Sequence, residues 1–330
     1  MRVLTSVRQI LATASVATAF AFAAVPSSYA LDKIVFGTYW LPVAEFGGFY
    51  QALADGTYAA NGLDVDLKAG GPQINTAQLL AAGAYDVAVG VNSLVPLNLA
   101  AQGASTVAVA SIYQKDPQAL MAHEEMGFKT LADLKGHPIL VSTDSVSTFW
   151  QFLKVKYDFS DNQIRPYTFN MAPFLNDKTA VHQCYITNEP QMLAAKGIKT
   201  TTFLLADYGY ASYSSLLIAS KKMMTERRDV LRRFVAATIT GWSTFLHGDP
   251  AKARAAILKA NPDYTPANFD ASRAALIRYG IVESGDALTR GIGAMTAERW
   301  KAFFDTMVAA GVLPAKLDYK SAYSLEFLAK

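Results

Sequence analysis

Cysteine is nearly absent from this chain of 330 residues, which has one cysteine and four histidines. A single cysteine excludes a disulfide scaffold and any zinc or iron–sulfur site that needs several thiolates. Charged residues are also few, at 17% of the sequence, and the formal net charge of +3 is too small for a phosphate-binding surface, so no nucleic-acid partner is expected. The 52% share of hydrophobic residues excludes a disordered chain, and the mean hydropathy is too low for a polytopic membrane protein.

The sequence also lacks the motifs that mark common enzyme classes. It contains no GxGxxG or Walker pattern for phosphates and no GxSxG elbow for a nucleophilic serine. His182 and Cys184 alternate on one face of a predicted strand, but two ligands do not complete a metal site, and a Cys–His nucleophile would need an orienting group and an oxyanion hole. We therefore predict packing roles for both residues, and no catalytic residue, cofactor or metal.

The first thirty residues have the three-part layout of a secretory signal peptide. Arg2 and Arg8 give a basic start, residues 10–25 are apolar or small, and small residues stand at the third-last and last positions before the end at Ala30. Cleavage after Ala30 is predicted, rather than retention as an anchor helix, because the apolar stretch is short for a membrane span. No cysteine lies near the cut to carry a lipid anchor, so the mature chain is predicted to reside in the periplasm.

From residue 31 onward, strand-like runs alternate with helical segments in two series. Repeated strand–helix–strand units predict mostly parallel sheets with helices on both faces. The predicted strands cover residues 34–39, 63–68, 86–91 and 106–112 in the first series, and 138–142, 164–169, 182–186, 200–204 and 215–219 in the second. The predicted fold class is α/β with two lobes, residues 31–115 forming the first part of lobe 1 and residues 116–218 forming lobe 2.

The rest of the chain, residues 219–330, is predicted to be helical and to pack back on lobe 1. A helix over residues 226–247 carries an apolar stripe on one face and arginines on the other. The two lobes would be joined by strands that cross near residues 111–121 and 215–220. Such an arrangement closes like a hinge around a ligand.

Aromatic residues make up 12% of the sequence, more than a plain core requires, which suggests a stacking site for a flat ligand. The segment 39–50 follows the first predicted strand, at the carboxyl edge of the sheet where ligands of open α/β folds bind. Within it, Trp40 and Phe46 stand outside regular elements and are the stronger ligand candidates, while Tyr50 adds a further flat face. Core packing is the alternative role for each of these rings.

A second segment, residues 185–190, follows a predicted strand of lobe 2. Glu189 is predicted to direct its carboxylate at the cleft, where a charge-assisted hydrogen bond would hold an amino-substituted or protonated nitrogen heterocycle. The alternative is an acid that stabilises the start of a helix. The predicted ligand-binding set draws on both lobes and comprises Trp40, Phe46, Tyr50, Asn92, Trp150, Tyr185, Asn188, Glu189 and Tyr210.

Taken together, these segments resemble the NMT1-type family of periplasmic substrate-binding proteins of ABC importers. The resemblance rests on the order and spacing of short pieces: Trp40 and Pro42, Gly48 and Tyr50, Gly70 to Pro72, and Tyr185 to Pro190. It implies a type II periplasmic-binding fold and a helical C-terminal part packed on lobe 1. It also implies that the chain is a monomer that works with a permease and an ATPase in the inner membrane.

The sequence departs from the pyrimidine-related members of this family at one position. Those members carry a histidine four residues after the proline of the Trp-x-Pro pattern, where this chain has Phe46. Pyrimidine-synthesising enzymes of the same fold consume that histidine, so its absence argues against their activity. The resemblance implies capture of a small planar nitrogen-containing compound similar to a pyrimidine. The alternatives are an importer component for a sulfonate or nitrate, a pyrimidine-processing enzyme, and a sensor that delivers its ligand to a membrane receptor.

Overall fold

Ten strands form two five-stranded sheets in the computed structural model, which describes residues 30–71, 74–168 and 170–328. The first sheet has the order β2-β1-β3-β10-β4, with β1 (Asp32–Gly37), β2 (Leu63–Lys68), β3 (Val87–Asn92), β4 (Thr106–Tyr113) and β10 (Ser214–Ser220). The second has the order β7-β6-β8-β5-β9, with β5 (Gln118–His123), β6 (Ile139–Val141), β7 (Ile164–Pro166), β8 (Val181–Tyr185) and β9 (Thr200–Leu204). The predicted signal peptide lies outside the described residues, apart from Ala30.

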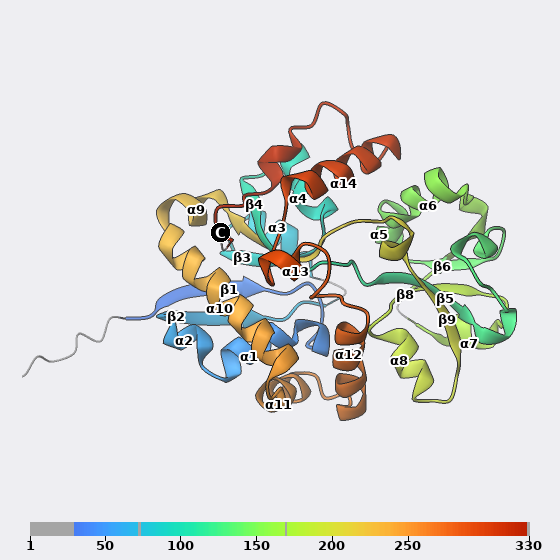
Figure 1. Cartoon of the computed structure of the whole chain (residues 1–330), viewed down its shortest axis with the longest axis horizontal. Helices are drawn as coiled ribbons and strands as arrows, with labels where there is room; N and C mark the ends of the chain where they lie inside the picture. Colours follow the sequence, from blue (N-terminus) through green and yellow to red (C-terminus); the bar gives the residue numbers. More distant parts are fainter. Residues whose placement is uncertain (1–29, 72–73, 169, 329–330) are drawn as a thin grey trace, which may run out of the picture. The chain divides into compact units, whose positions relative to one another are not determined.

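Each sheet contains one strand that runs against its neighbours, and that strand follows a crossing between the lobes. β10 pairs antiparallel with β3 and β4, and β5 pairs antiparallel with β8 and β9. The chain crosses through residues 114–117 between β4 and β5, and through residues 205–213 between β9 and β10. Figure 1 shows the two sheets in separate halves of the compact unit Leu31–Lys330, which confirms the predicted two-lobed α/β fold.

Two predicted boundaries differ from the structure. Residues 214–218, assigned to lobe 2 from the sequence, belong to β10 in the first sheet, because a hydrophobic pattern marks a strand without showing which sheet accepts it. The helical pattern of the sequence predicts one helix over residues 47–58. In the structure this stretch is divided at Gly56 into α1 (Gly47–Ala54) and α2 (Thr57–Ala60). Gly56 has a left-handed φ of 86°, a conformation that glycine adopts readily and that interrupts the helix.

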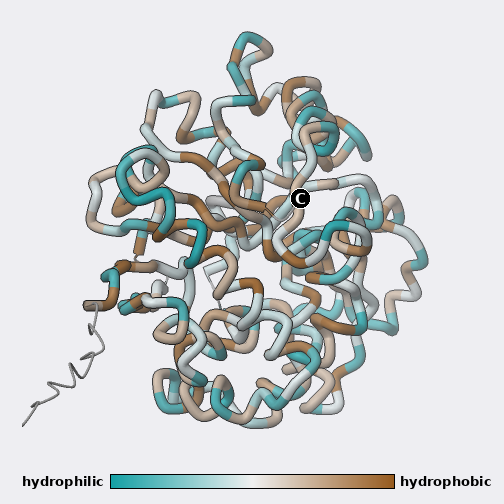
Figure 2. Tube along the Cα trace, turned by 60° about the vertical axis from the view of Figure 1, so that its left-hand side comes forward, coloured by the Kyte–Doolittle hydropathy of each residue, from teal (hydrophilic) through white to brown (hydrophobic). Residues whose placement is uncertain are grey.

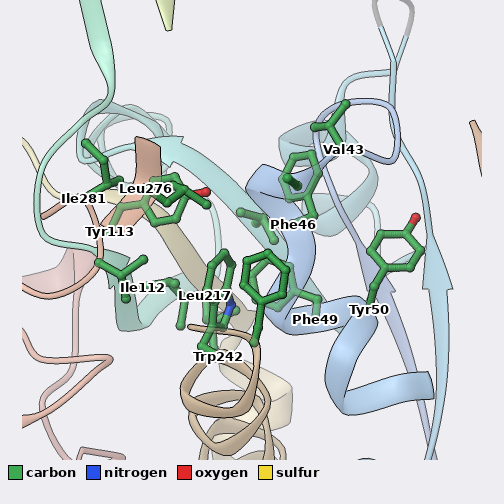
Figure 3. Close-up of a cluster of buried hydrophobic side chains, with 14 of the residues drawn as sticks. Val43, Phe46, Phe49, Tyr50, Ile112, Tyr113, Leu217, Trp242, Leu276 and Ile281 are labelled. Atoms are coloured by element: carbon green, nitrogen blue, oxygen red, sulfur yellow. The ribbon is translucent and has the colours of Figure 1, made fainter. Parts of the chain in front are cut away.

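The helical C-terminal part packs on lobe 1, as predicted. α10 (Arg228–His247) lies along α1, where the rings of Trp242 and Phe49 meet edge to face with centroids 5.4 Å apart (Figure 3). The other helices of this part are α9 (Lys221–Glu226), α11 (Ala251–Ala260), α12 (Pro266–Arg278), α13 (Ala287–Arg290) and α14 (Ala297–Ala309). Within the described ranges, no helix combines the length and the apolar character that a membrane crossing requires.

Shorter helices connect the strands within each lobe. They are α3 (Thr76–Ala81) and α4 (Leu94–Ala101) in lobe 1, and α5 (Thr143–Val146), α6 (Phe149–Tyr157), α7 (Ala172–Asn176) and α8 (Glu189–Ala194) in lobe 2. Figure 2 shows hydrophobic stretches running through the interior and hydrophilic residues gathered on outer turns. The sheets and the inward sides of the helices therefore form the core. A ligand-binding site is expected at the carboxyl ends of the strands, where the chain leaves the core.

Replacing Gly241 with alanine should destabilise the fold, because α1 and α10 approach closely there. A Cβ atom on Gly241 would lie 2.5 Å from the carbonyl oxygen of Gly48 and 2.5 Å from the Cβ atom of Ala52. Such overpacking should lower the free energy of unfolding by about 1–3 kcal/mol. Urea unfolding measures the loss, with Ser243→Ala at an exposed position of the same helix as the control. Equal stability of the two variants would contradict the close helix contact.

Candidate ligand-binding site

The loop after β1 is fixed by a close backbone contact with Gly70. The Gly70 amide donates a hydrogen bond to the carbonyl oxygen of Trp40, with an N···O distance of 3.1 Å. A Cβ atom on Gly70 would lie 2.3 Å from the carbonyl oxygen of Thr38, so a larger residue does not fit. Gly70 therefore holds the segment 39–50 at the carboxyl end of β1.

Side chains that follow β1 and β8 meet where the two lobes touch. Glu45 lies in the short 3-10 helix η1 (Ala44–Phe46), and its Oε1 accepts a hydrogen bond of 2.8 Å from the hydroxyl of Thr187, just beyond β8. Both side chains are buried. The hydroxyls of Tyr185 and Tyr39 also form a hydrogen bond. These bonds join the carboxyl end of a lobe 1 strand to that of a lobe 2 strand.

Three carboxyl groups, those of Glu45, Asp116 and Glu189, are set around this contact. Asp116 lies in the first crossing, and its Oδ1 accepts a hydrogen bond of 3.1 Å from the amide of Gln118. Glu189 begins α8, and its Oε2 accepts a hydrogen bond of 2.8 Å from the amide of Tyr185. Lobe 1, lobe 2 and the connection between them therefore contribute one acid each.

All three acids have a raised pKa. Burial raises the pKa of Glu45 to about 7, the hydrogen bond from Thr187 lowers it, and the nearby charge of Glu189 raises it again. Burial raises the pKa of Asp116 to about 7, although a backbone amide and the Asn92 side chain act in the opposite direction. Burial also raises the pKa of Glu189 to about 7. These groups change charge close to neutral pH.

Several hydrogen-bond acceptors near this contact are buried and have no hydrogen-bond partner in the part of the chain that the structure describes. They are Glu45 Oε2, Asp116 Oδ2, Asn188 Oδ1 and the Tyr210 hydroxyl oxygen. Buried polar atoms are nearly always paired in folded proteins, and an unpaired one costs about 1–3 kcal/mol. A ligand that presents N–H groups would pair with these oxygens. The interlobe cluster, as we name it, comprises Tyr39, Glu45, Asp116, Tyr185, Asn188, Glu189 and Tyr210.

The polar residues predicted from the sequence lie in or beside the interlobe cluster. Residues 185–189 supply three of its members. The pKa of Tyr210 is raised by burial and also by the charge of Asp116, which places its hydroxyl near that carboxyl group. Asn92, at the end of β3, lies beside the same carboxyl group and lowers its pKa. The structure therefore brings these residues together from both lobes.

The aromatic residues predicted from the sequence have different surroundings. Trp40 is partly exposed and packs at the border of the core. Phe46 is buried, with its ring edge to face against Tyr39 and the centroids 5.0 Å apart. Tyr50 is buried on the side of α1 away from Trp242, as Figure 3 shows, and burial raises its pKa to about 12. Phe46 thus packs against Tyr39, a member of the interlobe cluster.

Trp150 is not brought to the interlobe cluster. It lies on α6, fully buried, where its ring packs against Phe159 and its Nε1 donates a hydrogen bond of 2.8 Å to Asp161. The expectation that Trp150 offers a ring face to the ligand is therefore corrected. An amphipathic helix turns its large apolar side chains into the core of its own lobe, and α6 does so here.

Tyr39, Glu45 and Asp116 belong to the interlobe cluster but were not among the residues predicted from the sequence. Glu45 had a usable signal, because it is the one acid in the otherwise apolar or aromatic segment 39–50. Asp116 had a weaker signal in the sequence, because it is an acid in the short connection between two strands that are fully buried in the structure. Tyr39 had none, since it reads as the last residue of a strand. Burial and the meeting of the lobes, rather than residue type, distinguish these three.

His182 and Cys184 are buried in β8, in the core of lobe 2. The His182 ring lies 4.2 Å from the Tyr167 ring and 5.6 Å from the Phe174 ring, and burial lowers its pKa to about 4. Burial raises the pKa of the Cys184 thiol well above its usual range. A neutral imidazole and a protonated thiol have the character of packing residues. Among the described residues, no three His, Cys, Asp or Glu side chains gather into a metal-binding group.

The free energy of unfolding should fall as pH rises from about 5.5 to about 8. The folded chain keeps protons on Glu45, Asp116 and Glu189 up to about pH 7, whereas an unfolded chain releases them near pH 4. Over this range the unfolded state binds fewer protons, so stability is lost as pH rises. His182, with its pKa lowered to about 4, opposes the trend but is one group against three.

Urea unfolding at about pH 5.5 and about pH 8 measures this difference, which should reach a few kcal/mol. Glu45→Gln should weaken the pH dependence, because it removes one of the three titrating groups. Glu226→Gln, at an exposed position on α9, should leave the dependence unchanged. Wild-type protein that is more stable at the higher pH would contradict the buried state of the acids.

The chain forms two α/β lobes that are joined by two crossings, and polar groups of both lobes lie at their contact. This arrangement is the periplasmic-binding-protein fold. The alkanesulfonate-binding protein SsuA of Xanthomonas axonopodis pv. citri, solved with MOPS bound, matches with a TM-score of 0.64 over 90% of this chain and 100% of that chain, at 16% identity. The sequence profile of the NMT1/THI5-like family matches residues 43–253, more than half of the chain. The chain belongs to the NMT1/THI5-like family, as its motifs predicted.

Two relatives are similar in sequence over much of the chain. The riboflavin-binding protein RibY of Chloroflexus aurantiacus is 24% identical over 306 residues, which cover 90% of this chain and 86% of that protein. The formylaminopyrimidine-binding protein of Halalkalibacterium halodurans is 27% identical over 221 residues, which cover 64% of this chain and 66% of that protein. Both relatives are binding proteins by name.

Proposed function

We propose that this chain is the extracytoplasmic solute-binding component of an ABC importer and that it captures a small planar nitrogen-containing compound between its lobes. The observation that carries the proposal is the interlobe cluster, where both lobes and their connection gather acids and unpaired acceptor oxygens. Family membership and the fold support the transport role. The partners are a permease and an ATPase of the inner membrane, and the chain acts as a periplasmic monomer.

The charge of the interlobe cluster favours a ligand that donates hydrogen bonds. Carboxylates bind amino groups and protonated ring nitrogens through charge-assisted hydrogen bonds, which contribute about 1.5–3 kcal/mol each. A sulfonate or nitrate would place a further negative charge beside the carboxyl groups of Glu45, Asp116 and Glu189, which repel it when they are ionised. Riboflavin and formylaminopyrimidine, named in the two relatives, both contain nitrogen-bearing aromatic rings, which supports the same class of ligand.

In this proposal, each lobe has its own part in binding. Trp40, partly exposed after β1, stacks on the ligand ring, an interaction worth about 1–3 kcal/mol. Tyr185, Asn188 and Glu189 bind the polar edge of the ring from lobe 2. The buried states of His182 and Cys184 leave no activated nucleophile between them, which supports binding rather than catalysis.

Native mass spectrometry of the protein purified from its own periplasm tests the proposal. Calorimetry with riboflavin, an aminopyrimidine and an alkanesulfonate then ranks the probes by affinity. The proposal expects a co-purified nitrogen heterocycle and binding of at least one heterocyclic probe. A tightly held sulfonate would overturn the ligand class, and chemical conversion of the captured compound would overturn the binding role.

Ligand binding should close the lobes and reduce the radius of gyration. The bond between Glu45 and Thr187 forms only when the lobes meet, and the two crossings, residues 114–117 and 205–213, are the strand connections that allow rotation between them. Small-angle X-ray scattering with and without a saturating heterocycle, identified by the calorimetry, measures the change. An unchanged radius in the presence of a bound ligand would contradict closure.

A further inference from the structure

The two lobes touch on both sides of the crossings that join them. On one side, Glu45 and Thr187 form a hydrogen bond of 2.8 Å, and α8 contacts α12. On the other side, α6 of lobe 2 contacts α14 of the C-terminal part. Figure 1 shows α6 and α14 above the crossings and α8 and α12 below them. The crossings therefore lie between two separate contacts of the lobes.

One side of α14 runs along the second of these contacts. Residues at i, i+4, i+7 and i+11 lie on the same side of a helix. On α14 and its C-cap they are Arg299, Phe303, Thr306 and Ala310. Arg299 donates hydrogen bonds to carbonyl oxygens of both crossings, and the Phe303 ring lies 5.7 Å from the Tyr210 ring. This side of α14 therefore begins at the crossings and continues outward from them.

A crevice of about 260 Å³ lies between α6 and α14. This α6–α14 crevice, as we name it, is lined by Phe152, Val155, Lys156, Thr306, Ala309 and Ala310. Its inner end is packed, because the Phe152 ring lies 5.3 Å from the Tyr210 ring, which places Tyr210 between the two helices. Its outer end is open, because Ala309 is small and Val155 is 57% exposed. The space between the helices therefore widens away from the crossings.

The two helices hold different parts of the second crossing. In α6, the Lys156 Nζ and the Tyr157 hydroxyl donate hydrogen bonds of 2.7 Å and 2.8 Å to the carbonyl oxygen of Tyr208. In α14, Arg299 donates one of 3.1 Å to the carbonyl oxygen of Ala211. Because residue 208 is held by lobe 2 and residue 211 by α14, the chain between them absorbs a rotation of one lobe against the other. Rotation about this point moves the two contacts in opposite directions, so that one closes as the other opens.

We propose that the α6–α14 crevice controls how far the cleft opens: the crevice narrows as Glu45 and Thr187 separate, and its small lining residues leave room for that movement. Filling the crevice therefore favours the closed form in the absence of ligand. A larger closed fraction raises the affinity for any compound bound between the lobes, because the apparent dissociation constant is the intrinsic one divided by the competent fraction. The inference rests on the binding role in the proposed function and is independent of the ligand class.

Two variants test the proposal by placing a large side chain in the crevice from either wall. They are Ala309→Trp on α14 and Val155→Trp on α6. Ala255→Trp, at an exposed position on α11, is the matched control. Small-angle X-ray scattering of the ligand-free proteins measures the radius of gyration, and hydrogen exchange at the amides of Phe46 and Asn188 reports on the contact at the cleft. Cooperative urea unfolding confirms that the variants are folded.

Both crevice variants should have a smaller radius of gyration than the control, and the two amides should exchange about three- to tenfold more slowly. The proposal is overturned if either variant matches the control in both measurements. A larger radius with faster exchange would also overturn it, because the crevice would then widen together with the cleft. No ligand is added, so a sulfonate captured from the periplasm would correct the ligand class and leave this result unaffected.

Discussion

Glutamine in place of Glu189 should weaken the binding of an aminopyrimidine by about tenfold to hundredfold at about pH 8. The change keeps the shape of the side chain but removes its charge, so a charge-assisted hydrogen bond of about 1.5–3 kcal/mol is reduced to a weaker neutral one. Calorimetry of wild type and variant measures the loss. Glu298→Gln, at an exposed position in the first turn of α14, is the matched control and should bind as wild type does.

The sign of the Glu189→Gln effect distinguishes the two ligand classes. An anion such as an alkanesulfonate is repelled by a carboxylate, so the same substitution should leave its affinity unchanged or improve it. A variant that binds the aminopyrimidine as tightly as wild type does would show that Glu189 serves α8 alone, as an acid at the start of a helix.

Methionine in place of Arg299 should lower the free energy of unfolding by roughly 3 kcal/mol and loosen the connections between the lobes. The Arg299 guanidinium on α14 donates hydrogen bonds to the carbonyl oxygen of Gln114 in the first crossing, and to those of Ala211, at 3.1 Å, and Ser212, at 3.2 Å, in the second. It also lies 4.1 Å from the centroid of the Tyr213 ring. Methionine keeps the apolar stem but leaves these carbonyl groups without their donor.

Urea unfolding and hydrogen exchange measure the two consequences of Arg299→Met. Amides of residues 114–116 and 205–213 should exchange faster in the variant, because one side chain ties both crossings to α14. Lys301→Met is the control on the same helix, since Lys301 forms an exposed pair with Asp305 that contributes at most about 1 kcal/mol. Stability and exchange like those of this control would contradict the role given to Arg299.

The sequence predicts the fold well because strand and helix periodicity are local properties. The alternation of strand-like and helical segments predicts both lobes. The apolar stripe of α10 predicts that this helix packs on lobe 1, where it contacts α1. The sequence does not predict which sheet contains β10, because residues 214–220 pair with strands that are far away in the chain. Pairing partners of that kind depend on tertiary packing, which a local pattern does not contain.

The candidate site was only partly predictable for a related reason. Glu189 and Asn188 are predicted as site residues because they follow a strand, where the carboxyl edge of a sheet binds ligands. Asp116 was missed because its burial depends on two crossings that come together only in the folded chain. Trp150 was wrongly included because ring chemistry alone does not show whether a helix turns a tryptophan to the cleft or to the core.

The central claim is that the acids of the interlobe cluster bind a hydrogen-bond-donating nitrogen heterocycle. The most direct measurement is the affinity of wild type for an aminopyrimidine at about pH 6 and about pH 8, beside that for an alkanesulfonate. Because Glu45, Asp116 and Glu189 must be ionised to bind the amino groups, the pyrimidine should bind more tightly at the higher pH and release protons on binding. A tight sulfonate complex with the opposite pH dependence, and no binding of the pyrimidine, would contradict the claim.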